Sequence, residues 1–171
     1  MARGLESLTR EELIELLEIT AKDLIALDGT WFQSLEREQG MDTAMEHDRA
    51  AWRRFVPSEA RRLKKLLGLS DRCGLEGLAE ALPLRCTSLA NEWEILWEDD
   101  GSLVFRITDC RVQNARARKE MEFHPCKSVG ELEYAGFAAA LDDRIHCECV
   151  SCFPDITDET CNCAWRFWVE G

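Results

Sequence analysis

The chain contains no long apolar run and no excess of positive charge. No stretch approaches the ~20 consecutive apolar residues that cross a bilayer, and the opening MARGLESLTREELIELL has no apolar segment before a small-residue cleavage site. We therefore expect a cytoplasmic protein. The net charge of −12 repels phosphate groups and anionic lipid surfaces, so we expect direct binding to neither nucleic acid nor membranes.

Motifs that identify common enzyme classes are also missing. The sequence has no nucleophile elbow, phosphate-binding loop, dinucleotide fingerprint or H-E-x-x-H pattern, so it gives catalysis no direct support. It has only three histidines. We expect His47 to be solvated and His146 to point away from Cys147 on a strand, which leaves His124 as the histidine placed to reach a metal beside Cys126.

Cysteine is abundant: there are nine, and six of them lie between positions 126 and 163. A reducing cytosol disfavours disulfides, and an odd number cannot pair completely within one chain. Residues 86–171 carry eight basic and 17 acidic groups, a net charge of −9, which disfavours neighbouring thiolates unless a cation lies among them. We therefore expect a thiolate-bound metal, with zinc as the first choice and an iron–sulfur cluster as the alternative.

The first half of the chain has the apolar spacing of helices. Thr9 and Glu12 fit a capping box at the first helix start, and Asp28-Gly29 predicts a break or a kink. Pro57 should bend or split the longest helix. Further helices are expected at 31–39, from an N-cap at Asp42 to 67, and at 75–82.

After Pro83 the apolar period changes to two. Residues 93–97 and 103–107 predict a β-hairpin around 99–101, and strands are also expected near 144–149 and 161–169. Helical patterns cover 112–121 and 128–141. The predicted fold class is α+β, with a helical subdomain at 1–83 and a second subdomain at 84–171 in which two helices cross an antiparallel sheet of about four strands.

Strand parity groups the cysteines. Cys161, Cys163 and Trp165 alternate onto one face of the last strand, and the aromatic ring marks that face as the core side. If the last two strands pair as a hairpin, several thiols meet around Cys152. Cys126 can approach from the start of a helix, where the dipole favours a thiolate.

Several segments resemble an uncharacterised family of small prokaryotic cytosolic proteins. They are Asp109-Cys-Arg-Val-Gln-Asn-Ala-Arg, Phe123-His-Pro-Cys-Lys, Cys149-Val-Ser-Cys-Phe-Pro-Asp and Cys163-Ala-Trp-Arg-Phe. The same C-terminal pattern is similar to the 4-vinyl reductase domain and to the aromatic-sensing domains of phenol-responsive transcription regulators. Those domains hold a zinc with three cysteines and a glutamate, beside a buried pocket for a small hydrophobic ligand.

The resemblance implies a ligand set for the metal. Its first two cysteines correspond to Cys126 and Cys152, and its glutamate to Cys149. The last ligand is Cys163 or Cys161, and we prefer Cys163 because it begins Cys-Ala-Trp. An all-sulfur sphere is closed, which is typical of structural zinc. Among the other cysteines, Cys147 is an alternate or lies beside the metal, and Cys73, Cys86 and Cys110 are expected in the core.

A ligand pocket is expected between the helical layer and the sheet. Six tryptophans are present; most should pack in the core, but Trp31, Trp52, Trp93 and Trp97 are candidates to line an apolar ligand. The acidic side chains of the helices are expected on a solvated face, and residues 116–119 at an exposed helix end. The acidic residues concerned are Glu36, Asp48 and Glu59.

Two classes of function follow. The first is a zinc-stabilised module that binds or senses a small hydrophobic or aromatic ligand, has no output domain of its own, and acts through a homodimer or a protein partner. The second is a hydrolase- or reductase-like enzyme acting on a small cyclic substrate, which a distant likeness of the helical half to hydrolases of cyclic amino-acid substrates implies. A closed metal sphere favours the first class, and an open position holding water favours the second.

Overall fold

The structure is a computed structural model that describes residues 4–170. Within this range the fold is α+β, as predicted, and no helix is long and apolar enough to cross a bilayer. Short 3₁₀ helices cover Leu5–Ser7, Leu82–Leu84 and Ser88–Ala90. The main elements are α1 (Arg10–Gln39), α2 (Met41–Leu67), α3 (Gly74–Ala81), β1 (Glu92–Trp97), β2 (Leu103–Asp109), α4 (Arg111–Arg118), α5 (Lys127–Leu141), β3 (Ile145–Cys152) and β4 (Cys163–Val169).

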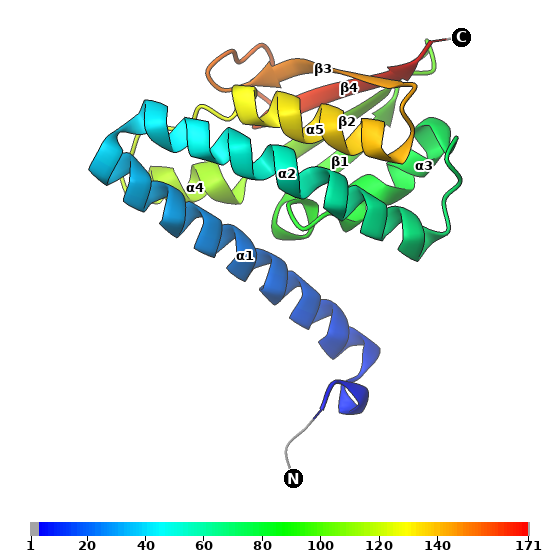
Figure 1. The fold of residues 1–171 in the computed structure, drawn as a ribbon, viewed down its shortest axis with the longest axis horizontal. Coiled ribbons are helices and arrows are strands. Elements are labelled where there is room, and N and C mark those ends of the chain that lie inside the picture. The colour runs from blue at the N-terminus through cyan, green and yellow to red at the C-terminus, as the bar shows by residue number, and fades with distance from the viewer. Residues whose placement is uncertain (1–3, 171) are drawn as a thin grey trace.

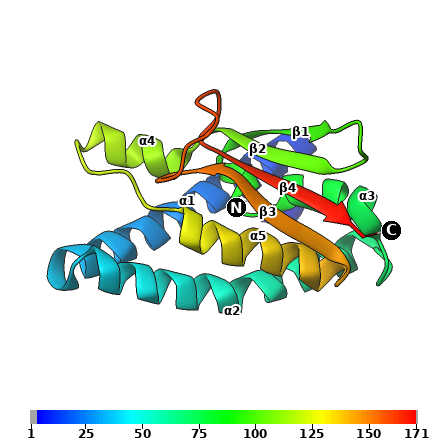
Figure 2. The ribbon, with the colours of Figure 1, turned by 90° about the horizontal axis from the view of Figure 1, so that it is seen from above.

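The four strands form one antiparallel sheet in the order β1-β2-β4-β3. Helix α5 lies between this sheet and α2, and α1 runs diagonally from the end of α2 away from the body (Figures 1 and 2). One buried cluster joins Val56 and Leu78 to Phe105, Phe137 and Trp165. The segments 1–83 and 84–171 therefore share a hydrophobic core.

The predicted break at Asp28-Gly29 is wrong, because α1 is continuous through both residues. A glycine inside a helix costs about 1 kcal/mol, but Ile25 and Phe32 are buried on either side of it and hold the helix against the body. The predicted capping box is confirmed: Thr9 Oγ1 accepts a hydrogen bond from Glu12 N at 3.2 Å.

Helix α2 begins after Gly40 instead of at the predicted N-cap Asp42. It runs through Pro57 without being split, and the alternative of a bend stays a prediction. The proline removes the hydrogen bond that the carbonyl of Arg53 would accept, but Arg53 is exposed, so water can reach that carbonyl. The predicted end is confirmed, since Gly68 takes the left-handed conformation with φ of 67°.

Both predicted hairpins form. In the second, Cys149 pairs with Trp165 and Cys152 pairs with Cys163, across a register shift between Cys149 and Ser151. The extra residue restores Cys152 to the face that Cys163 occupies. The parity prediction is wrong for Cys161, which precedes β4 and packs against Val104 and Ala164 instead of the core that contains Trp165.

Candidate functional site

A partly enclosed cavity of about 270 Å³ lies between the first two helices, α4, α5 and the end of β4 where Cys163 lies. Its walls are mainly apolar and aromatic, but polar groups gather at one end. The aromatic side chains are Phe32, Trp52, Tyr134 and Trp165. The acidic or thiol side chains are Asp28, Asp48, Cys110, Cys126, Glu133, Cys152 and Cys163, and the basic side chains are Arg111, Arg116, Arg118, Lys119 and His124.

An Asp-His-Cys array lies in the wall of the cavity. His124 Nε2 is 3.2 Å from Asp48 Oδ2, and His124 Nδ1 is 3.2 Å from Cys126 Sγ. Gln113 fixes this geometry: its side-chain amide donates to the carbonyl of His124 at 2.9 Å and to Cys126 Sγ at 3.3 Å, and it accepts from the backbone N–H of His124 at 3.0 Å. Three elements contribute: α2, α4 and the residues before α5.

Asp28 faces the cavity from the middle of α1. Burial, and then the negative charge of Asp48, raise the pKa of its carboxyl from 3.8 to about 6. Within residues 4–170, Asp28 makes no hydrogen bond and no ion pair. Helix α1 therefore carries a carboxyl group whose negative charge has no ion-pair partner among these residues.

Four thiols share the cavity: those of Cys110, Cys126, Cys152 and Cys163. Burial raises the pKa of the Cys126 thiol well above 9.0, and the charges of Cys110 and Cys163 raise it further. The pKa of Cys163 is also raised, first by a hydrogen bond with Cys152 and then by burial. The thiols of Cys126 and Cys163 are therefore neutral at physiological pH unless a cation or a base stabilises the thiolate.

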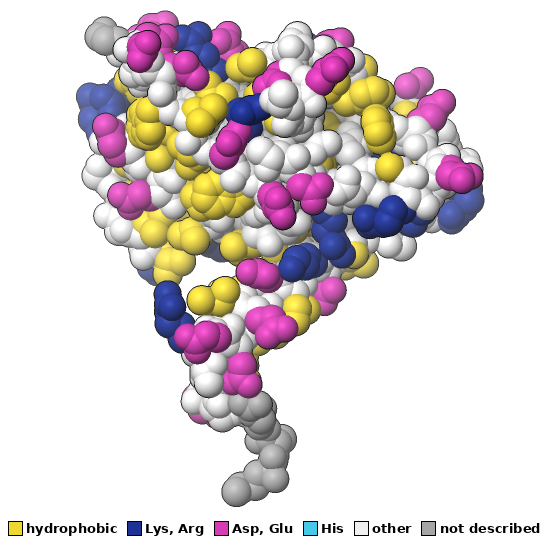
Figure 3. Space-filling model, turned by 180° about the vertical axis from the view of Figure 1, so that it is seen from behind, with side chains coloured by type: hydrophobic (Ala, Val, Ile, Leu, Met, Phe, Trp, Pro, Cys, Tyr) yellow, Lys and Arg dark blue, Asp and Glu magenta, His cyan; other side chains and the backbone are white. Residues whose placement is uncertain are grey.

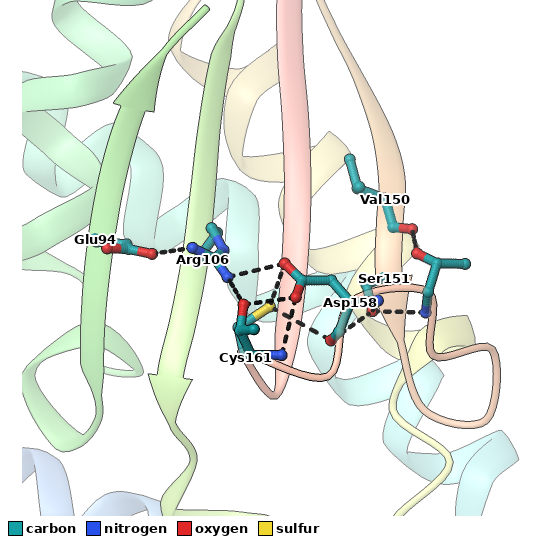
Figure 4. Close-up of polar contacts among 8 residues, drawn as sticks. Glu94, Arg106, Val150, Ser151, Asp158 and Cys161 are labelled. Carbon is teal, nitrogen blue, oxygen red and sulfur yellow. Dashed lines mark hydrogen bonds and ion pairs between the residues drawn. The ribbon is translucent and has the colours of Figure 1, made fainter.

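The loop between β3 and β4 holds Cys152 and Cys163 in register. Ser151 Oγ accepts hydrogen bonds from the backbone N–H groups of Thr157 and Asp158, each at 3.1 Å. Asp158 in turn binds Arg106 at 2.8 Å, and Cys161 Sγ lies 3.6 Å from the same carboxylate (Figure 4). This polar network lies beyond the lining of the cavity, and it fixes the hairpin end from the outside.

The predicted metal ligands are only partly brought together. Cys126, Cys152 and Cys163 line the cavity, but Cys149 lines a separate hollow with Cys147 and Lys127. Burial raises the pKa of Cys149 to about 11. Within residues 4–170, no group of three or more His, Cys, Asp or Glu side chains is arranged to hold a metal ion. Zinc and an iron–sulfur cluster stay predictions.

Of the four tryptophans predicted for the pocket, Trp52 lines the cavity. The other three are outside its lining: Trp31 is 70% exposed, Trp97 is 51% exposed, and Trp93 stacks on Phe105 at the edge of the sheet. The cavity lies at the cysteine end of the sheet because α1, α4 and α5 meet there, whereas β1 is an edge strand. Cys110, Cys126, Cys152 and Cys163 line the cavity directly.

The expectation of solvated acidic side chains is wrong for all three residues. Asp48 is buried against His124, Glu59 is buried against Arg85, and Glu36 pairs with Arg116 at 2.7 Å. Arg116 is itself buried, so the exposed helix end predicted for 116–119 is wrong for this residue, whereas residues 117–119 are exposed as predicted. The cavity residues that sequence reasoning missed include Asp28, Asp48, Cys110 and Glu133.

Comparison with known proteins places this arrangement in a family. Residues 6–169 match a family of unknown function, DUF6125. The chain belongs to that family. Since the match spans almost the whole chain, the cavity and its polar end lie within the family region. Neither the curated proteins nor the solved structures yield a match.

Proposed function

We propose that the protein binds a small, mostly aromatic molecule in this cavity, with a positively charged group of the ligand directed to the carboxylates. The observation that supports this proposal is the cavity itself. Its volume of about 270 Å³ exceeds the ~150 Å³ that accommodates benzene in an engineered apolar site. The aromatic walls suit a ring, and the same rings attract a cation.

The charge of the ligand follows from the uncompensated acids. Asp28 lacks an ion-pair partner among the described residues, and Asp48 has only His124. An ammonium or amidinium group placed between these carboxylates would offset the repulsion that raises the pKa of Asp28. A carboxylate on the ligand would add to that repulsion. These two carboxylates therefore favour an aromatic cation over a neutral or an anionic compound of the same size.

Benzylamine, benzyl alcohol and benzoate test this order, because they have similar size and differ in charge. We expect the amine to raise the melting temperature most and benzoate least, with an increase that grows with ligand concentration. Quenching of tryptophan fluorescence measures the same binding, since Trp52 and Trp165 line the cavity. Equal effects of all three compounds would contradict the charge assignment, and no effect of any of them would contradict binding of small aromatic molecules.

Gly29→Leu is a variant designed to fill the cavity. Gly29 lines the cavity from α1, and a Cβ atom added there meets no atom within 4 Å. The substitution also removes a glycine from a helix, so the protein should stay folded and gain stability. Gly29→Ala is the matched control, because it improves the helix but adds only a methyl group. We expect binding of benzylamine to be lost in the first variant and retained in the second.

Zinc at the cysteine end is the second part of the proposal. The cavity offers Cys126, Cys152 and Cys163 as thiolate ligands, with Cys110 in the same lining, and zinc binds such donors with Zn–S distances of ~2.3 Å. Elemental analysis of tag-free protein should give about one zinc per chain. Iron with sulfide would indicate a cluster instead, and folded protein with neither metal would contradict both.

Two cysteine variants separate a metal ligand from a core residue. Cys152→Ser should lower the melting temperature much more than Cys73→Ser, because the binding energy of a structural metal contributes to folding. Cys149→Ser reports on the predicted ligand in the separate hollow. If Cys149→Ser behaves like Cys73→Ser, Cys149 is not a ligand.

A second candidate function is catalysis, which the Asp48-His124-Cys126 array favours. His124 could accept the thiol proton while Asp48 orients the ring. Cys126 Sγ would then attack an activated carbonyl carbon, the leaving group would depart, and water would hydrolyse the thioester. With p-nitrophenyl acetate, this predicts a burst of p-nitrophenolate that is lost in Cys126→Ser and His124→Ala and retained in Cys110→Ser. Metal bound to Cys126 would exclude this function, because that thiolate would be a ligand.

A further inference from the structure

A stripe of exposed apolar side chains runs along α1. Leu17 is 59% exposed, Leu27 is 68% exposed and Trp31 is 70% exposed, and Leu13 and Leu24 are also exposed. Figure 1 shows the first half of α1 leaving the body, and Figure 3 shows yellow side chains on this projecting part from behind. A water-exposed helix that carries so many large apolar side chains is typical of a protein contact surface.

The spacing of the stripe is that of a helix–helix seam. Positions 13, 17, 20, 24, 27 and 31 follow steps of four and three residues, which is the heptad spacing of coiled coils. We call these six residues, with Thr20 as the polar member, the α1 stripe. The residues that α1 buries against the body, Ala21, Ile25 and Phe32, lie about a quarter of a turn away. The α1 stripe is therefore free while α1 stays packed on its own chain.

We propose that the α1 stripe pairs with the α1 stripe of a second copy of this chain, forming a two-fold symmetric dimer. Such an interface is self-complementary, since the same surface is used twice. The five apolar side chains of the α1 stripe expose very roughly 550 Å² when a large side chain is taken as ~200 Å². The flanking Ile14 and Leu16 bring this area to about 700 Å², close to the ~800 Å² per partner of a stable interface.

Charge supports a second copy over a basic partner. The positions that flank a heptad seam usually carry the charges that select a partner. Here the flanks of the α1 stripe include Ile14, Leu16, Ala21 and Thr30, and only Asp23 and Asp28 are charged. Most acidic residues of α1, such as Glu15 and Glu18, lie away from the stripe. The flanks therefore repel a second copy only weakly and offer little to attract a strongly basic helix.

The mass of the full-length chain in solution tests the proposal. Light scattering during gel filtration should give twice the chain mass of 19.6 kDa, and dilution should restore the monomer. The double variant Leu17→Glu with Leu24→Glu should be monomeric, because it places four carboxylates in the seam of a dimer. Both residues are exposed, so circular dichroism should show an unchanged fold.

Ile19→Glu is the matched control, since Ile19 is an exposed apolar residue of α1 that lies outside the stripe. It should remain dimeric. Trp31 gives an independent signal: its emission should shift to the blue on association, and acrylamide should quench it less in the dimer. A chain that is monomeric at high concentration in both low and high salt would overturn the proposal. A dimer that survives the double variant would overturn it as well, because the interface would lie elsewhere.

Discussion

Two pairs of carboxylates differ in how their charge is balanced. Glu59 and Glu133 share one buried guanidinium: Arg85 Nε lies 3.1 Å from Glu59 and Nη2 lies 2.7 Å from Glu133. Among the described residues, Asp28 and Asp48 form no ion pair with a lysine or arginine, and His124 is the partner of Asp48 at 3.2 Å. The first group is a buried ion-paired unit between α2, the segment after α3, and α5, in which Arg85 Nη1 has no hydrogen-bond partner among the described residues. The second faces a cavity and remains open to a cation from outside the protein.

This difference separates a stabilising role from a binding role. Paired buried charges hold elements together but leave no capacity for a ligand. An unpaired buried carboxylate costs stability, and such a cost is typical of sites that bind or react. Glu133 belongs to both surroundings, because it lines the cavity and pairs with Arg85.

The largest expected effect comes from removing the shared guanidinium. Arg85→Met should destabilise the protein by about 3–5 kcal/mol, since it leaves two buried carboxylates without a cation. It also removes the packing of the guanidinium on Phe137, 4.5 Å from the ring centroid. Urea unfolding measures the loss. Arg53→Met, at an exposed position of α2, is the control and should change stability little.

If charge is the cause, the triple variant that adds Glu59→Gln and Glu133→Gln to Arg85→Met should recover part of the loss. No recovery would mean that Arg85 acts mainly through packing.

At the cavity we expect a substitution of a carboxylate to increase stability instead of lowering it. Asp28→Asn should stabilise the protein by about 1–2 kcal/mol near neutral pH, after allowance for solvent screening of a partly exposed group. The folded pKa of about 6 lies above the ordinary 3.8, so the folded protein loses stability as the pH rises from about 4 to 6. The gain of the variant should therefore appear over this interval and vanish below it.

Thermal unfolding of both proteins across this pH range measures the effect. Glu46→Gln, on the exposed surface of α2, should show no such pH-dependent gain. A loss of stability in Asp28→Asn would mean that the carboxylate has a partner in the folded protein.

The sequence predicts the fold better than it predicts this cavity. The periods of 3.6 and 2 in the positions of apolar residues are local signals, and so is the side-chain pattern of a helix cap. The capping box at Thr9 and the strand pairs of the last hairpin could therefore be anticipated. The break expected at Gly29 could not be corrected from local signals, because burial of Ile25 and Phe32 against other elements keeps α1 helical. Long-range contacts decide such cases.

The site shows the same limit. Asp48 and Glu59 look like ordinary surface acids of a helix, and only their partners, His124 and Arg85, reveal that they are buried. The pairing of Cys152 with Cys163 followed from the hairpin. Cys149 does not line the same cavity as Cys152, because the register shift before Ser151 separates the two residues along the strand. The spacing of the cysteines in the sequence does not predict that shift.

The smallest expected effect links the ligand to the proton of Asp28. Benzylamine carries an amine that stays protonated throughout, since alkylamines titrate near pH 10, whereas Asp28 changes from neutral to charged around pH 6. The advantage of benzylamine over benzyl alcohol should therefore grow roughly fivefold between about pH 5 and pH 7.5. In Asp28→Asn the advantage should be smaller and nearly constant with pH.

By linkage, the bound amine lowers the pKa of Asp28, so binding near pH 6 should release protons. Calorimetry in two buffers of different ionisation enthalpy detects this release. A pH-independent preference in the unmodified protein would assign the amine to Asp48 or to the aromatic walls, and would remove Asp28 from the site.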